Sequence, residues 1–61
     1  MGMRLKEFIS VTFNNHVLDV YVHGQHTLNQ PFDSETGERF VDLDAAESWL
    51  LKFYPDYFTP V

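Results

Sequence analysis

The residues of this 61-residue chain best suited to metal binding or proton transfer are its three histidines. His23 and His26 lie three positions apart, whereas His16 lies roughly 20 Å away along the same predicted hairpin, at about 3.3 Å per residue. A pair of histidines would need a carboxylate or a second subunit to complete a four-ligand zinc site, and the chain has no cysteine to contribute a thiolate. We therefore interpret all three as surface or turn residues, and we expect no metal and no cofactor.

Acidic residues concentrate in the segment QPFDSETGERFVDLDAAESW, residues 30–49. Its acids are Asp33, Glu35, Glu38, Asp42, Asp44 and Glu47. The composition is similar to that of a calcium-binding EF-hand loop, but Gly37 falls at position five instead of six, and position twelve is an aspartate instead of a glutamate. Turn and helix-cap chemistry accounts for most of these acids. The remaining alternative is a phosphate-mimicking surface formed by Asp33, Glu35, Glu38 and Asp42.

The chain contains no recognisable arrangement for nucleophilic catalysis. Ser10 lies on a predicted strand with no histidine placed to activate it, and Ser34 and Ser48 lie in acidic surroundings. No glycine-rich nucleotide-binding motif occurs. A pair of carboxyl groups acting as general acid and base would need a cleft to shift one pKa, and a domain this small has little material to build one. We therefore predict a protein that is not an enzyme and has no catalytic residues.

Charge and length limit the partners. The formal net charge is −5, and only four basic residues occur, so no basic stripe for direct nucleic-acid binding can be assembled. No apolar run approaches the 18 or so residues of a membrane span, and no signal-peptide pattern is present, so we expect the cytoplasm of the producing cell and no membrane partner. A chain this short has a marginal core, which favours assembly with copies of itself or with other subunits.

The elements that must position these residues begin with a hairpin. Residues 4–13 and 17–23 alternate between apolar and polar side chains, and Asn14 and Asn15 can form a two-residue turn. The predicted register pairs Val11 with Leu18, Ile9 with Val20 and Phe8 with Tyr21. The pair of Phe8 and Tyr21 would lie on the polar face, either as an ordinary cross-strand contact or as a contact point for another subunit.

A second, irregular hairpin and one helix are predicted to follow. QHTLNQPF reads as an edge strand, SETG as a turn with Gly37 in the left-handed region, and ERFVDL as a short returning strand. Asp44 and Glu47 have the spacing of a capping box, so Asp44 is the predicted N-cap and Asp42 the competing choice. The apolar stripe of the helix comprises Ala46, Trp49, Leu50 and Phe53, and Pro55 should end the helix at or just before Tyr54.

Together these elements predict an α+β fold in a single domain, residues 1–61, with the order ββ(ββ)α and the helix packed on the sheet. Residues 1–3 are expected to be disordered, and residues 55–61 to form a C-terminal tail. We expect Trp49 to anchor the helix in the core. The expected partner-binding residues are Phe8 and Tyr21 on the sheet, with Tyr54, Tyr57 and Phe58 near the end of the chain.

The segment PFDSETGERFVDLDAAESWL resembles a pattern found in small bacteriophage structural proteins of the tail or head surface. In that pattern a P-[FH]-[ND]-x-x-T-G-x-[PR]-[FW] turn precedes a short helix containing E-A-x-x-W. The turn is matched by Pro31, Phe32, Asp33, Thr36, Gly37, Glu38 and Phe40, and the helix by Ala46, Glu47 and Trp49 with the Glu-Ala order reversed. The resemblance implies a small virion module that binds other virion subunits and a host-surface glycan. It implies no catalytic residue.

The leading hypothesis is therefore a non-enzymatic protein-interaction module of a phage virion, which associates with itself or with other virion subunits. The first alternative is an acidic inhibitor that binds a basic host nuclease, polymerase or defence protein through the acidic cluster of residues 33–47, with Asp33, Glu35, Glu38 and Asp42 as its contact residues. The second alternative is a glycan-binding module that uses exposed aromatic side chains.

Overall fold

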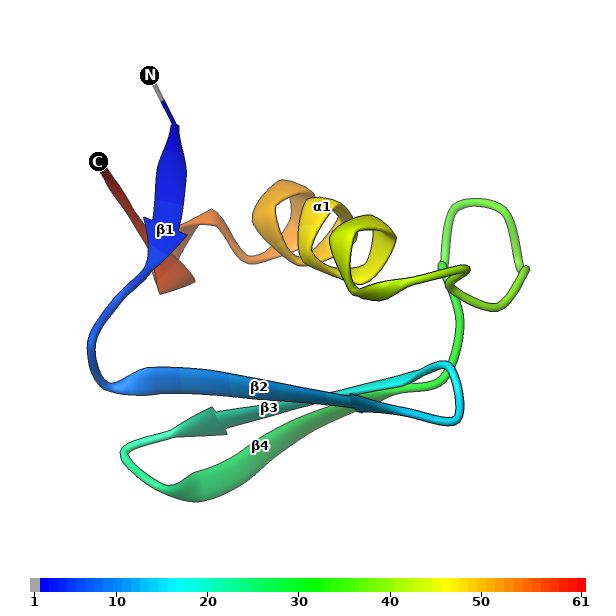
Figure 1. The fold of residues 1–61 in the computed structure, drawn as a ribbon, viewed down its shortest axis with the longest axis horizontal. Coiled ribbons are helices and arrows are strands. Elements are labelled where there is room, and N and C mark those ends of the chain that lie inside the picture. Colours follow the sequence, from blue (N-terminus) through cyan, green and yellow to red (C-terminus); the bar gives the residue numbers. More distant parts are fainter. Residues whose placement is uncertain (1) are drawn as a thin grey trace.

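The computed structural model describes residues 2–61, which form two layers (Figure 1). One layer is an antiparallel sheet of three strands in the order β2 (Ile9–Asn14), β3 (Val17–Val22) and β4 (Gln25–Gln30). The helix α1 (Leu43–Phe53) lies over one face of this sheet, and a short ladder of β1 (Met3–Leu5) with β5 (Phe58–Pro60) lies on the same side. The predicted α+β fold, with an N-terminal hairpin and a helix near the C-terminus, is confirmed.

The first hairpin forms, but its turn and register differ from the prediction. The turn residues are Asn15 and His16, with φ of 53° and 64°, instead of Asn14 and Asn15. Both φ values lie in the left-handed region, as a two-residue hairpin turn requires. The observed pairs are Ile9 with Val22, Val11 with Val20 and Phe13 with Leu18, a shift of two residues along β3. Because side chains alternate with a period of two, this shift leaves the two faces as predicted.

The observed register is the better one for burying apolar side chains. It places three apolar residues of β2 opposite three of β3. The predicted register would set Phe13 opposite His16 and Val22 opposite Glu7, and so leave an apolar residue facing a polar one at each end. His16 gains a further contact in the observed turn, because its Nδ1 lies 2.9 Å from the carbonyl oxygen of Phe40.

The predicted second hairpin is wrong. Residues 25–30 form β4, which pairs with β3 through a second two-residue turn at His23 and Gly24, with φ of 51° and 78°. Residues 38–42 form no strand and instead carry the chain from the sheet to the helix layer. The physical reason is Phe40, which is only 2% exposed and packs between the layers, where it cannot also belong to an edge hairpin.

The loop before the helix is closed by its own backbone. The Gly37 N–H donates to the Asp33 carbonyl at 2.7 Å, and the Asp33 N–H donates to the Glu38 carbonyl at 2.8 Å. Gly37 has a φ of 77°, as predicted for the residue that closes this turn. The loop is therefore a fixed element, and it holds Ser34 near the helix.

Asp42 caps α1, which corrects the predicted choice of Asp44. The Asp42 side chain accepts a hydrogen bond from the Ala45 N–H at 2.9 Å. Helical geometry thus begins at Leu43, so Asp44 lies inside the first turn, where its negative charge is favourable to the helix dipole. The helix ends at Phe53 with Tyr54 as its C-cap, as the position of Pro55 predicts.

The core lies between the sheet and the helix. It consists of Ile9, Leu18, Val20, Phe40, Ala46, Trp49, Leu50 and Phe58. Trp49 is 6% exposed, so its predicted role as the core anchor of the helix is confirmed. Its indole Nε1 donates a hydrogen bond to Ser34 Oγ at 2.9 Å, which satisfies its polar group and fastens the loop to the helix.

Both ends of the described chain are ordered into the fold, in contrast to the prediction. Met3 begins β1, so the expected disorder does not extend to it, and residue 1 lies outside the described residues. The expected tail forms the 3-10 helix η1 (Pro55–Tyr57) and then β5. The physical reason is Phe58, which pairs with Leu5 and closes one end of the core. No helix among residues 2–61 is long and apolar enough to cross a membrane.

The identity of the cap is testable by thermodynamic stability. Replacing Asp42 with alanine should lower the free energy of unfolding by about 1 kcal/mol, because the Ala45 N–H loses its acceptor. The matched change Asp44→Ala removes only a favourable charge in the first turn and should cost a few tenths of that, roughly 0.3 kcal/mol. Urea denaturation of both variants measures the difference. A larger loss for Asp44→Ala would contradict the assigned cap.

Candidate interaction surface

Residues 2–61 leave one face of the three-stranded sheet uncovered. The helix and the β1–β5 ladder both lie on the other face, where the core is formed (Figure 1). The strand registers place a mixed set of aromatic and polar residues on the uncovered side. We call this surface the open face, and its residues are Phe8, Ser10, Thr12, Asp19, Tyr21, His23, His26 and Asn29.

Two aromatic residues on the open face each pack against a histidine. The rings of Phe8 and His23 are stacked, with centroids 4.6 Å apart and an interplanar angle of 10°. The rings of Tyr21 and His26 lie 5.1 Å apart at 37°. The predicted cross-strand pair of Phe8 with Tyr21 is therefore not formed, although both residues do lie on the predicted face.

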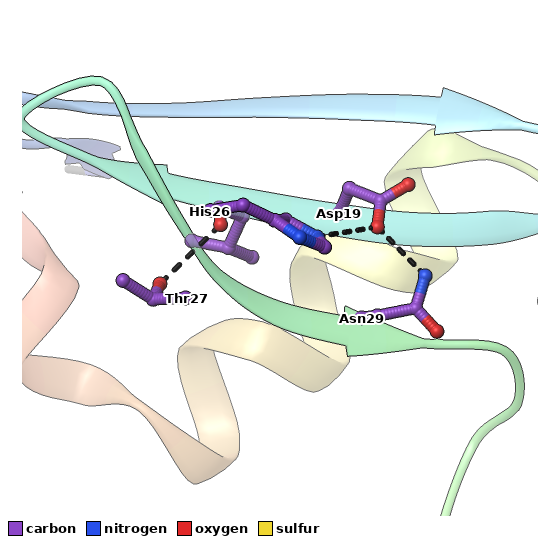
Figure 2. A network of polar contacts seen from close by, with 5 residues as sticks. Asp19, His26, Thr27 and Asn29 are labelled. Carbon is purple, nitrogen blue, oxygen red and sulfur yellow. Dashed lines mark hydrogen bonds and ion pairs between the residues drawn. The ribbon is translucent and has the colours of Figure 1, made fainter.

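A polar network crosses the same face from β3 to β4 (Figure 2). The Asp19 Oδ1 lies 2.8 Å from His26 Nε2 and accepts a hydrogen bond from Asn29 Nδ2 at 2.7 Å. The Asn29 amide, and after it His26, lowers the pKa of the Asp19 carboxyl below its ordinary value, while partial burial acts in the opposite direction. The network therefore holds Asp19 as a carboxylate and fixes the side chains around it.

An irregularity in β4 brings His26 and Asn29 to one face. Tyr21 pairs with His26 and Asp19 pairs with Asn29, so the three residues 19–21 of β3 lie opposite the four residues 26–29 of β4. Residues an odd number apart on a regular strand would point to opposite faces. Thr27 is the extra residue, and its Oγ1 donates a hydrogen bond to the Val20 carbonyl at 3.3 Å. Without this bulge the network could not form.

The other predicted contact residues do not join the open face. Phe58 is only 8% exposed in the core, so its expected exposure is wrong. Tyr54 and Tyr57 are half-buried and stacked on each other at 5.3 Å, and Tyr54 also packs against Trp49 at 5.8 Å. These two tyrosines belong to the helix layer and extend the core, whereas Phe8 and Tyr21 lie on the sheet.

The acidic segment is largely occupied by local structural roles. Asp33 Oδ1 accepts the Glu35 N–H at 2.8 Å, and Asp42 is the helix cap. Glu35 forms an ion pair with Lys52 at 2.5 Å, and this pair links the loop to the last turn of the helix. Among residues 2–61, no group of three or more histidine, aspartate or glutamate side chains lies close enough together to hold a metal ion.

A shallow groove of about 250 Å³ lies between β1 and α1. It is lined by Met3, Arg4, Leu5, Asp44, Glu47, Ser48, Leu51 and Phe58. Its one hydroxyl is that of Ser48, and no histidine is among the lining residues to pair with it.

His26 and Asn29 are the parts of the open face that sequence analysis missed, because the bulge breaks the alternation of β4. The alternation of residues 17–23 does place His23 on the same face as Asp19 and Tyr21, but nothing in the sequence indicated that His23 packs on Phe8. Comparison of the chain with protein-family models, with curated proteins and with solved structures finds no match in any of the three.

The network predicts a specific acid sensitivity. Because the pKa of Asp19 is lower in the folded state, its stabilising contribution is present above the ordinary aspartate value of 3.8 and is lost as the pH falls through the folded value. Asn29→Ala removes the largest cause of this shift. It should lower the free energy of unfolding at neutral pH by about 1 kcal/mol and flatten its decline below roughly pH 4.

Urea denaturation as a function of pH measures this effect. The matched control is Asn14→Ala, the same change at an exposed asparagine of β2, and it should leave the acid slope as in the parent. His26→Ala should also flatten the slope, because His26 lowers the pKa of Asp19 both by its hydrogen bond and by its charge. Equal slopes in the parent and in Asn29→Ala would contradict the role assigned to the network.

Proposed function

We propose that this chain is a non-enzymatic protein-interaction module that contacts its partner through the open face. The observation that carries the proposal is the composition of that face. A sheet face that only meets water normally carries polar side chains, whereas here it holds Phe8, which is 45% exposed, and Tyr21. Aromatic side chains are enriched at protein interfaces, where they bury a large area for few rotatable bonds.

The open face is also held in place before any partner arrives. Phe8 is stacked on His23, Tyr21 packs on His26, and His26 is held in turn by Asp19. Side chains that are already ordered lose less conformational entropy on binding, so their contacts contribute more of their energy to affinity. This order supports a binding surface over a merely solvated one.

The resemblance over residues 31–50 suggests the class of partner, namely other subunits of a phage virion. The acidic-inhibitor alternative is weaker, because three of its four residues already have local partners: Asp33 and Asp42 bind backbone N–H groups, and Glu35 binds Lys52. A phosphate mimic needs carboxylates that are free to meet a basic surface.

Site-specific photo-crosslinking tests the proposal in the cell that makes the protein. A photoreactive phenylalanine analogue at position 8 should give one discrete crosslinked protein, which mass spectrometry identifies as a subunit of the same particle. The matched control is position 53, where Phe53 on α1 is 44% exposed and so equally accessible, but does not lie on the open face. Position 53 should give no such product.

Other outcomes exclude the proposal in distinct ways. Equal products at positions 8 and 53 would mean that the open face is not the contact surface. A partner captured only at low salt, and lost on charge reversal of Glu35 and Glu38, would favour the acidic inhibitor. Specific signals on a glycan array that disappear in Tyr21→Ser would favour glycan binding instead.

A further inference from the structure

The strand β2 is an edge of the sheet with unused backbone hydrogen-bonding groups. It pairs with β3 on one side only. The His23 N–H donates to the Phe8 carbonyl at 2.8 Å, which fixes the alternation along the hairpin. Residues 8, 10, 12 and 14 therefore bond to β3, and the N–H and C=O groups of residues 9, 11 and 13 point away from it.

Most of these outward groups have no partner within the described chain. The Ile9 N–H donates to the Lys6 carbonyl at 2.9 Å, but no backbone bond from the loops or turns of residues 2–61 reaches Val11 or Phe13. The side chains of Val11 and Phe13 are only half-buried, in contrast to the buried Ile9. The edge of β2 therefore has both hydrogen-bonding capacity and apolar surface left to satisfy.

The other exposed edges of the fold carry features that discourage pairing, whereas β2 carries none. On β4, the bulge at Thr27 disturbs the ladder and Pro31 follows directly after the strand. In the two-stranded ladder, β1 carries the charged Arg4 and Pro60 of β5 lacks an N–H to donate. The residues of β2, ISVTFN, include no charge, no proline and no glycine. Natural proteins rarely leave such a strand unpaired.

The side chains of β2 are complementary to those of a second, antiparallel β2. If Val11 is placed opposite Val11 of the second copy, Ile9 falls opposite Phe13 on the helix side and Ser10 opposite Thr12 on the open side. The same register aligns the free backbone groups. The two Val11 residues exchange two N–H···O=C hydrogen bonds, and the Phe13 N–H of each copy donates to the Ile9 carbonyl of the other copy. Each contact occurs twice, as a twofold axis requires.

We propose that two copies of this chain pair through β2 to form one continuous six-stranded antiparallel sheet. The dimer places the two open faces side by side on one surface and the two helices on the other. This inference rests on the proposed function for its biological meaning, because joining two open faces gives a bivalent binding surface. Its physical basis, the unpaired edge of β2, is independent of that function.

The mass of the full chain in solution tests the dimer. Sedimentation equilibrium from micromolar to submillimolar concentration should give twice the mass of one chain. In Ser10→Lys/Thr12→Lys, each new ammonium group directly opposes another across the twofold axis, so the dimer should be lost over this range. Within one chain these exposed positions lie opposite Tyr21 and Asp19, where a cation is tolerated. Circular dichroism checks that the variant folds.

The matched control adds the same two charges away from β2. Gln25→Lys/Val41→Lys alters two exposed residues outside that strand and should remain dimeric. A parent protein that is monomeric throughout, a dimer that survives Ser10→Lys/Thr12→Lys, or a control that also becomes monomeric would each overturn the proposal. If Ser10→Lys/Thr12→Lys does not fold, isotope-filtered NMR on the parent decides, by the presence or absence of a contact between the Hα atoms of Ser10 and of Thr12 in the second copy.

The dimer and the proposed function fail in different experiments. A monomeric parent that still crosslinks its partner through position 8 overturns the β2 pairing alone. A dimeric parent with equal crosslinking at positions 8 and 53 overturns the role of the open face alone.

Discussion

A single helix of eleven residues can bury only one face of the sheet, and the rest of the structure depends on this constraint. The buried apolar residues of β2 and β3 all face the helix, and the alternate residues of both strands must therefore meet solvent or a partner. Residues 2–61 contain no second α-helix that could cover the other side. The open face is exposed for this reason, and its aromatic side chains distinguish it from an ordinary solvated face.

Trp49 makes the two-layer arrangement possible with so few residues. Its indole packs against Phe40 at 5.9 Å and Tyr54 at 5.8 Å, and it reaches Ser34 in the loop with its one polar group. The loop that carries four of the nine acidic residues is therefore held by the core. Three of its carboxylates serve a turn, the helix cap and the ion pair with Lys52. The acidic residues that are clustered in the sequence therefore act, in the folded chain, mainly to shape and hold the loop that connects the sheet to the helix.

The pattern of side chains predicts some features of this fold and is insensitive to others. Alternation in residues 4–13 and 17–23 correctly separates the two faces, but a shift of two residues preserves that alternation, so the pattern alone cannot select the register. The correct register follows only when the apolar partners at both ends of the hairpin are compared. The cap was ambiguous because Asp42 and Asp44 both precede apolar residues, and the choice depends on where helical geometry starts. The polar network on the open face could not be predicted from the sequence, because the bulge at Thr27 changes which residues of β4 share a face.

The ladder of β1 and β5 has a consequence for the order of folding. Met3 pairs with Pro60 and the Val61 N–H donates to the Gly2 carbonyl at 3.0 Å, so these pairs close a loop that contains nearly all of the described chain. The two hairpins of the main sheet close loops of only two residues each. Loop-closure entropy rises with the logarithm of loop length, and contacts between distant residues slow folding. We therefore expect Leu5 and Phe58 to complete the core only after the local hairpins and the helix have brought the two ends of the described chain together, so that the ladder forms last.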